Sequence, residues 1–376
     1  MTSFDYESLK YKIAINLIPG IGGVLAKKLI ESAGSPEEVF SSSKAFLQNI
    51  SGIGKTLAEN ITNHTILAHA EKEIEFITKY RIKTLYYRDE GYPERLRECP
   101  DSPVVLFIRG EADLDNPRVL SIVGTRNAST YGLEFCRDLV SALTSRGHNT
   151  LVVSGLAYGI DICAHKAALE NQLPTVAVLA HGLSTIYPSS HRNVAEKIIG
   201  QGALVTDFGS KTLPERGNFL KRNRIIAGLA DATIVIESSV KGGALITADL
   251  ASSYNRDVFA LPGRINDKRS QGCNSLIKAN KAALIEKVED IEYIMNWHPT
   301  DKLKGKRELR LMNGLNSEER SIILLLGDKE KMTADQISNE TGIGSGQISY
   351  LLLNLECMGY ITCHPGNMYS LSVSFF

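Results

Sequence analysis

The chain has 376 residues, 43% of them hydrophobic, which is enough for two or three globular domains with hydrophobic cores. Lysine plus arginine equals aspartate plus glutamate at 42 each, so the overall charge points to neither a polyanionic nor a basic partner. The N-terminal residues lack the pattern of a signal peptide, and no apolar run is long enough to span a membrane.

The six cysteines are scattered along the chain without a C-x-x-C pair. Structural zinc sites and disulfide frameworks both need recognisable cysteine spacings. The sequence therefore predicts reduced thiols, a cytoplasmic location and no metal site.

Residues 1–78 are predicted to form a helical domain of the helix-hairpin-helix or SAM-like kind. Two similar turns, PGIG at 19–22 and SGIG at 51–54, each precede an amphipathic stretch. Such a turn can present backbone N–H groups to a phosphate from a helix N-terminus, or it can simply join two helices of a bundle. The nearby cations are Lys27, Lys28 and Lys55.

Residues 79–300 are predicted to form a Rossmann-like domain. Short strand-like runs, IKTLYY and VVLFIRG, come first, and from Val119 apolar runs alternate with amphipathic helical patterns. Alternation of this kind is typical of βαβ units, whose right-handed crossovers place helices on both faces of a parallel sheet. The predicted fold class is therefore α/β, with a doubly wound parallel sheet.

Residues 301–316 are polar and basic and are predicted to be a linker. Residues 317–376 show three helical patterns followed by a hairpin pattern, the order of a winged-helix domain. A winged helix reads DNA with its third helix, but here that segment, 347–358, has no lysine or arginine. The domain is expected either to contact a protein partner or a second copy, or only to stabilise the chain.

Short glycine-containing segments of two or three residues follow six predicted strands in turn. In a parallel sheet these turns meet at the carboxyl edge, where α/β proteins bind ligands beside backbone N–H groups and helix N-termini. Glycine also permits tight turns without any ligand. The six are Gly124-Thr125-Arg126, Ser154-Gly155, His181-Gly182, Asp207-Phe208-Gly209, Lys241-Gly242-Gly243 and Leu261-Pro262-Gly263.

A basic segment, ERGNFLKRNR at 215–224, borders the same edge and places Phe219 among four cations. Cations that follow a phosphate backbone and a ring that stacks on a base are what a single strand requires. The alternative is a solvated helix face with Phe219 in the core. Arg126→Ala, and likewise the double change of Lys221 and Arg222 to alanine, is expected to weaken single-strand binding with little loss of stability.

Other chemistries lack their sequence patterns. The first strand of the alternating region is not followed by G-x-G-x-x-G, so no dinucleotide cofactor is predicted. Gly54-Lys55-Thr56 resembles the end of a P-loop, but Asn49 stands where its first glycine belongs. His165 has no partnered nucleophile and is expected to be a packed helix histidine. No catalytic residue and no cofactor are predicted.

The blocks GTRNAS, SGLAYGIDICAH, FLKRNRIIAGLAD, KGGALITADLA and VFALPGRINDKRSQGCNSLI resemble, in order, the signature blocks of the DprA/Smf family of DNA-processing proteins. The resemblance implies non-catalytic binding of single-stranded DNA, protection of incoming strands during natural transformation, and loading of RecA recombinase onto them. It also implies a homodimer formed through the Rossmann-like domain. The predicted DNA-binding residues are Arg126, Ser154, Gly155, Arg216, Phe219, Lys221, Arg222, Asn223, Arg224, Lys241, Gly242 and Gly243.

A rival hypothesis is a Rossmann-like nucleotide phosphoribohydrolase of the lysine-decarboxylase-like group. Those enzymes carry P-G-G-x-G-T-x-x-E after a strand, whereas residues 240–249 lack the second Gly-Thr and the glutamate. Cleavage of a glycosidic bond needs a placed carboxylate, and Asp249 is offset along the helix. Release of ribose from nucleoside monophosphates would distinguish the two. A winged-helix transcription factor is a third hypothesis, which predicts sequence-specific binding to duplex DNA.

Overall fold

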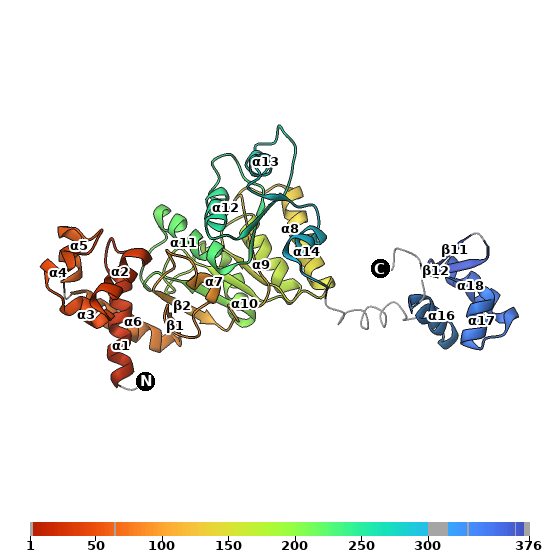
Figure 1. Ribbon diagram of the computed structural model, residues 1–376, viewed down its shortest axis with the longest axis horizontal. Coiled ribbons are helices and arrows are strands. Elements are labelled where there is room, and N and C mark those ends of the chain that lie inside the picture. Colours follow the sequence, from red (N-terminus) through yellow and green to blue (C-terminus); the bar gives the residue numbers. More distant parts are fainter. Residues whose placement is uncertain (1–2, 64, 300–314, 329–330, 365, 372–376) are drawn as a thin grey trace. The chain divides into compact units, whose positions relative to one another are not determined.

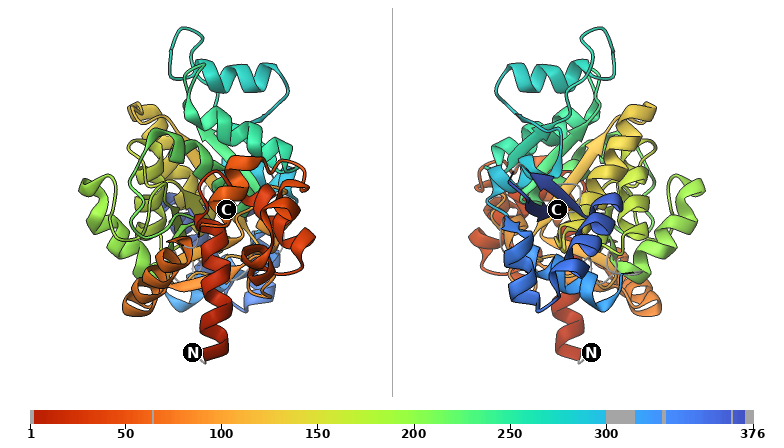
Figure 2. Two further views of the ribbon diagram at one scale, coloured as in Figure 1. Left: turned by 90° about the vertical axis from the view of Figure 1, so that its left-hand side faces the viewer. Right: turned by 90° about the vertical axis from the view of Figure 1, so that its right-hand side faces the viewer.

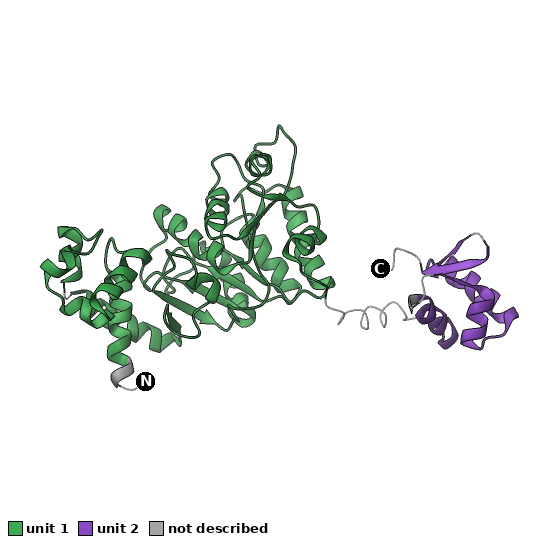
Figure 3. Ribbon diagram, viewed as in Figure 1, with its two compact units in different colours: residues 1–300 green, residues 301–376 purple. Residues whose placement is uncertain are grey.

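The structure is a computed structural model that describes residues 3–63, 65–299, 315–328, 331–364 and 366–371. The chain divides into two compact units, residues 1–300 and 301–376 (Figure 3). Most of the predicted linker, residues 301–314, lies outside the described residues. Among the helices that are described, none is both long and apolar enough to cross a bilayer.

The described part of the first unit is built on one nine-stranded sheet with the order β1-β2-β6-β5-β4-β3-β7-β8-β9. The strands from β6 to β9 in this order are mutually parallel, whereas β1 and β2 form an antiparallel pair at the β6 edge. The bounds are β1 (Lys83–Tyr86), β2 (Val105–Gly110), β3 (Val119–Gly124), β4 (Leu151–Ser154), β5 (Thr175–Val178), β6 (Ala203–Thr206), β7 (Ala232–Ile236), β8 (Asp257–Ala260) and β9 (Ala283–Leu284).

Helices cover both faces of this sheet (Figure 1, Figure 2). Alternate strand residues enter two cores: Leu120 and Ile122 pack beneath α8, α9 and α14, while Val119 and Val123 pack beneath α11, α12 and α13. This arrangement confirms the predicted doubly wound α/β fold. The bounds are α7 (Glu94–Arg97), α8 (Thr130–Ser145), α9 (Ile160–Glu170), η1 (Ser189–His191), α10 (Arg192–Gln201), α11 (Arg216–Leu229), α12 (Gly243–Ser253), α13 (Gln271–Lys278) and α14 (Val288–Met295).

Two related hairpins organise the N-terminal helices. Gly20 and Gly52 adopt left-handed φ angles of 83° and 95°. A Cβ on Gly20 would lie 2.9 Å from Leu57, and one on Gly52 would lie 2.9 Å from Leu25, so each hairpin packs against the helix of the other. The bounds are α1 (Ser3–Leu17), α2 (Gly23–Ala33), α3 (Pro36–Ser41), α4 (Lys44–Gln48), α5 (Lys55–Ile61) and α6 (Thr65–Tyr80).

The N-terminal helices share one hydrophobic core with the β1–β2 side of the sheet, including Phe107 and Leu204. Polar contacts fix this packing. The buried Glu73 of α6 accepts hydrogen bonds from the backbone N–H and the Oγ of Ser210 at 2.7 and 2.8 Å, and burial raises the pKa of its carboxyl. Lys27 donates to Ser102 Oγ at 2.6 Å, so its charge is turned inward, away from any ligand of the hairpin.

The second unit has the winged-helix order that the sequence predicts. A core of Ile322, Leu326, Ile337, Leu352 and Leu355 lies between its helices. The sheet order β10-β12-β11 adds a short third strand to the predicted hairpin. The bounds are α16 (Ser317–Asp328), β10 (Met332–Thr333), α17 (Ala334–Thr341), α18 (Ser345–Cys357), β11 (Ile361–His364) and β12 (Met368–Leu371).

We predict that Glu73→Ala lowers the free energy of unfolding of the first unit by about 1.5–3 kcal/mol, because it leaves the buried N–H of Ser210 without an acceptor. Urea unfolding followed by circular dichroism measures the change. Glu75 lies exposed on the same helix, and Glu75→Ala should stay within about 0.5 kcal/mol of the unaltered protein. Equal unfolding midpoints for the two variants would show that the Glu73 contact is not needed for docking.

Candidate nucleic-acid interface

The loops that follow the parallel strands lie along the carboxyl edge of the sheet. The strand order changes direction between β3 and β7, the position at which doubly wound proteins open a ligand crevice. Here the two loops are joined, because Thr125 N–H donates to the carbonyl of Glu237 at 2.8 Å. The crevice expected at this point is therefore narrowed by the backbone itself.

Glu237 also occupies the N-terminus of α8. Its carboxylate accepts from the N–H of Ser129 at 2.8 Å and from the Ser129 hydroxyl, while Ser129 Oγ caps Gly132 N–H at 3.2 Å. Glu237 is only 2% exposed and adopts a left-handed φ of 56°, which is uncommon for a residue other than glycine. A helix N-terminus that would otherwise attract a phosphate thus holds an internal anion.

Two aromatic rings lie beside Arg126, which follows Thr125 in the loop after β3. The guanidinium of Arg126 lies 5.1 Å from the centroid of the Phe219 ring, and Phe219 meets Tyr187 edge-on at 5.9 Å. Tyr187 and Tyr158 are 43% and 48% exposed. The ring of Tyr158 packs edge-on against His191, four residues after Tyr187. We call Tyr158, Tyr187 and Phe219 the aromatic cluster. Its members come from the loops after β4 and β5 and from α11, so they lie along one edge.

Sequence reasoning selected Phe219 but missed Tyr158 and Tyr187. Both tyrosines lie in strand-end loops, within AYGID and IYPSS, and both precede a helix that starts at the carboxyl edge. An aromatic residue in such a loop could have been recognised by the same argument that selected the glycine-containing segments. Phe219 itself is half-buried, so it serves both the packing of α11 and the surface.

Arg222, in contrast, points into the protein. It is 3% exposed, and its Nη1 donates to the carbonyl of Val178 at 3.1 Å. Burial lowers its pKa to about 10, while the neighbouring Asp161 carboxylate favours its charged form. Burial likewise raises the pKa of Asp161, which accepts from the N–H groups of Ala157 and Gly155. An added Cβ on Gly155 would lie 1.5 Å from Arg222 Nη1, so glycine is required for this approach.

The remaining predicted residues divide between interior and surface. Ser154 Oγ donates to Ile122 O at 2.6 Å inside the sheet, and Asn223 Nδ2 donates to Gly243 O at 3.4 Å. Arg224 is half-buried and pairs with the carboxylate of Asp207 and the carbonyl of Asp101. The residues exposed to solvent are Arg126, Arg216, Lys221, Lys241 and Gly243, with Gly242 half-buried beside them.

The histidines of this region belong to the interior. His165 is fully buried, its Nδ1 lies 2.8 Å from Thr175 Oγ1, and burial lowers its pKa to about 3. His191 contacts the carbonyl of Leu156 at 2.8 Å. Over the described residues, no group of three histidine, cysteine or acidic side chains has the arrangement of a metal site.

The burial of Arg222 corrects the expectation that its replacement leaves stability unchanged. We predict that Arg222→Ala lowers the free energy of unfolding by about 3–5 kcal/mol, because Asp161 would remain as a buried charge without its cation. Lys221→Ala, one residue away and exposed, should change it by no more than about 0.5 kcal/mol. Thermal and urea unfolding of the two variants measure the difference, and equal stabilities would contradict the prediction.

Comparison with known proteins places this geometry in a family. Residues 83–296 match the family described as DNA recombination-mediator protein A. Residues 15–64 match a SAM-like helix-hairpin-helix tandem, and residues 310–367 match the DprA winged-helix domain.

Protein Smf of Synechocystis is 31% identical over 96% of this chain and 98% of its own length. Protein Smf of Escherichia coli is 35% identical over 74% of each chain.

Two solved structures are similar. The X-ray structure of DprA from Streptococcus pneumoniae superposes with a TM-score of 0.65 at 32% identity, covering 75% of this chain and 96% of that one. A structure described for the single-stranded-DNA binding mode of DprA from Helicobacter pylori superposes with a TM-score of 0.52 at 29% identity, covering 57% and 96%. The chain therefore belongs to the DprA/Smf family of DNA-processing proteins.

Proposed function

We propose that the carboxyl edge of the sheet binds single-stranded DNA without catalysing a reaction. The observation that carries the proposal is the guanidinium of Arg126 over the Phe219 ring at 5.1 Å, with the Tyr187 ring edge-on to Phe219 at 5.9 Å. Unpaired bases stack on aromatic rings and on guanidinium planes, and each stacked base contributes about 1–3 kcal/mol. A duplex keeps its bases stacked on one another and cannot use these rings.

Cations beside the aromatic cluster are suited to the phosphates. Arg216 and Lys221 are exposed on α11, and Lys241 is exposed in the loop after β7. Gly243 begins α12, whose N-cap makes no side-chain hydrogen bond, so no side chain occupies the start of this helix, where an anion is favourable. Arg126, Arg216, Phe219, Lys221, Lys241, Gly242 and Gly243 are the proposed contact residues. Ser154, Gly155, Arg222, Asn223 and Arg224 are proposed to hold them in place.

The phosphoribohydrolase alternative is less well supported by the site. A nucleotide at the β3–β7 position would need the N-terminus of α8, which the Glu237 carboxylate occupies. Asp249, the acid considered for that chemistry, forms an exposed ion pair with Lys281 at 3.0 Å. A carboxylate placed against a glycosidic bond would have to be free of such a partner.

Family membership supports the wider role. The Helicobacter pylori relative is described by its mode of binding single-stranded DNA. We propose that this chain, in the cytoplasm, protects incoming single strands during DNA uptake and helps to load RecA recombinase onto them. A homodimer formed through the Rossmann-like domain belongs to the same proposal.

The second unit is proposed not to be the main DNA-binding surface. From residue 317 to 376 the sequence has three cations against seven acids, and α18 contains no lysine or arginine. Such a surface repels phosphates. Tyr350 and Leu353 are exposed on α18, at 68% and 60%.

We predict a clear preference for single strands over blunt duplex of matched length, with little dependence on sequence. The logarithm of affinity should fall with the logarithm of salt concentration by roughly 0.7 for each phosphate that the protein neutralises. Gel-shift titrations at several salt concentrations test both statements. Equal affinity for the two forms of DNA would refute the proposed function.

We further predict that Arg126→Ala weakens binding to a single strand about tenfold, or ~1.4 kcal/mol, because both a phosphate cation and a stacking plane are lost. Fluorescence anisotropy with a labelled oligonucleotide measures the affinity. Arg137 is exposed on α8, within the helix rather than in a strand-end loop, so Arg137→Ala is the matched control and should bind normally. Similar losses in both variants would mean that charge alone, rather than this edge, determines binding.

A further inference from the structure

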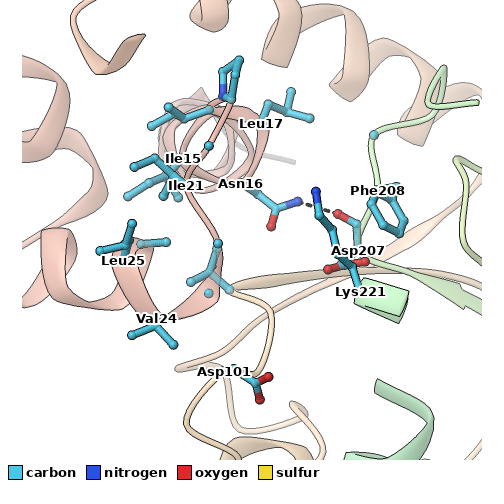
Figure 4. A pocket seen from close by; sticks show the side chains of 18 of the residues that line it. Ile15, Asn16, Leu17, Ile21, Val24, Leu25, Asp101, Asp207, Phe208 and Lys221 are labelled. Carbon is cyan, nitrogen blue, oxygen red and sulfur yellow. Dashed lines mark hydrogen bonds between the residues drawn. The ribbon is translucent and has the colours of Figure 1, made fainter. Parts of the chain in front are cut away.

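A cleft of about 610 Å³ lies between the first N-terminal hairpin, which joins α1 to α2, and the loop that follows β6 (Figure 4). One wall is formed by Asn16 and the turn from Pro19 to Gly23. The opposite wall is formed by Asp207, Phe208 and Lys221. The volume is within the range of small-ligand pockets, and the walls combine apolar side chains with a few polar groups, as such pockets usually do.

The hairpin presents an uncapped helix N-terminus to this cleft. Gly22, the N-cap of α2, has an extended backbone with φ −99° and ψ 177° and supplies no side chain. The first turn of α2 contains no acidic residue. A Cβ added to Gly22 would meet no atom within 4 Å, so the N-cap position has room for a side chain, and no side chain caps the first N–H groups of the helix. These groups are suited to an anion.

The other wall carries an unpaired acceptor. The Asp207 side chain is 10% exposed and pairs through Oδ2 with Arg224, while Asn16 Nδ2 donates to its backbone carbonyl at 2.7 Å. Its second carboxyl oxygen, Oδ1, has no hydrogen-bond partner among the described residues. A buried acceptor without a donor is costly. Because Arg224 already balances the charge of Asp207, a neutral N–H group of a ligand would satisfy Oδ1.

Lys221 supplies a cation to the wall of the cleft. It lines the cleft, is exposed, and lies two residues beyond Phe219 on α11. Figure 4 shows its side chain extending toward Asn16 and Asp207. Because residues two apart on a helix point to different sides, Lys221 presents its cation to the cleft, whereas Phe219 faces Arg126 and Tyr187.

We infer that this cleft binds one nucleotide, with its phosphate at the N-terminus of α2 and Lys221, and with a base N–H donated to Asp207 Oδ1. The inference rests on the proposed binding of single strands, and it adds the first helix hairpin to the binding surface. The nucleotide is either one unit of the strand or a free nucleoside monophosphate, since both supply the same phosphate and base groups.

The two hairpins supply a matched pair of variants. Gly22→Asp places a carboxylate over the N–H groups of α2, where aspartate is a favourable N-cap. Gly54 is the N-cap of α5, also extended at φ −83° and ψ 178°, and a Cβ there also meets no atom within 4 Å. Gly54 is not part of the wall of the cleft. Gly54→Asp therefore adds the same charge and the same cap at a site without the ligand. Both variants should melt no lower than the unaltered protein.

Binding is measured by fluorescence anisotropy with a single-stranded oligonucleotide of mixed sequence and by equilibrium dialysis with deoxycytidine monophosphate. We expect Gly22→Asp to bind at least one probe about tenfold more weakly than Gly54→Asp does, and the probe affected identifies the source of the nucleotide. Equal binding of both probes by the two variants would overturn the inference. If the two glycine variants bind equally while Arg126→Ala still binds the single strand about tenfold more weakly, the proposed function stands and only the cleft is excluded as a binding site.

Discussion

The candidate interface depends on the burial of Arg222 against Asp161. Arg222 fixes α11 across the ends of β4 and β5, because its guanidinium reaches the carbonyl of Val178 and occupies the space left by the missing side chain of Gly155. The Asp161 carboxylate in turn holds the loop after β4, because it accepts hydrogen bonds from the backbone N–H groups of Gly155 and Ala157. Burial of both charges is costly, and their mutual attraction, the Arg222–Val178 hydrogen bond and the N–H groups that Asp161 accepts from offset part of that cost. The same contact fixes α11, which carries Phe219 beside Arg126 and Lys221 in the wall of the cleft beside Asp207.

Internal carboxylates decide which helix N-termini remain available to anions. Glu237 occupies the start of α8, and Asp161 lies in the first turn of α9. Both positions face the carboxyl edge, where a Rossmann-like enzyme would hold a phosphate. The N-termini of α11 and α12 carry no side-chain cap. Internal carboxylates therefore take the usual anion positions at α8 and α9, which supports the proposed surface beside the basic helix α11 instead.

The fold was predictable because its signals are local. Alternating apolar runs predicted each strand from β3 to β8, and the glycine-containing segments located the carboxyl edge. The last strand, β9, was not predicted, because a strand of two residues shows no alternation of apolar and polar positions. The neighbouring helices α13 and α14 were not predicted either. The orientation of the basic segment was also missed. Arg222 lies three, four and seven residues before Ile225, Ile226 and Leu229, so helical periodicity alone places it on the buried face. The number of cations in the segment 215–224 does not distinguish Arg222, which is buried, from Arg216 and Lys221, which are exposed.

Pairing of charges explains how a chain with no net charge can offer a surface for a polyanion. Arg95, Arg146 and Arg256 are paired with Asp231, Glu292 and Glu98 and contribute little field at a distance. In the part of the chain that is described, Arg126, Arg216, Lys221 and Lys241 have no ion-pair partner. Salt screens exposed charges beyond about 8 Å at physiological strength, so a strand responds to these neighbours and not to the total. Affinity should therefore follow the local distribution of cations along the carboxyl edge.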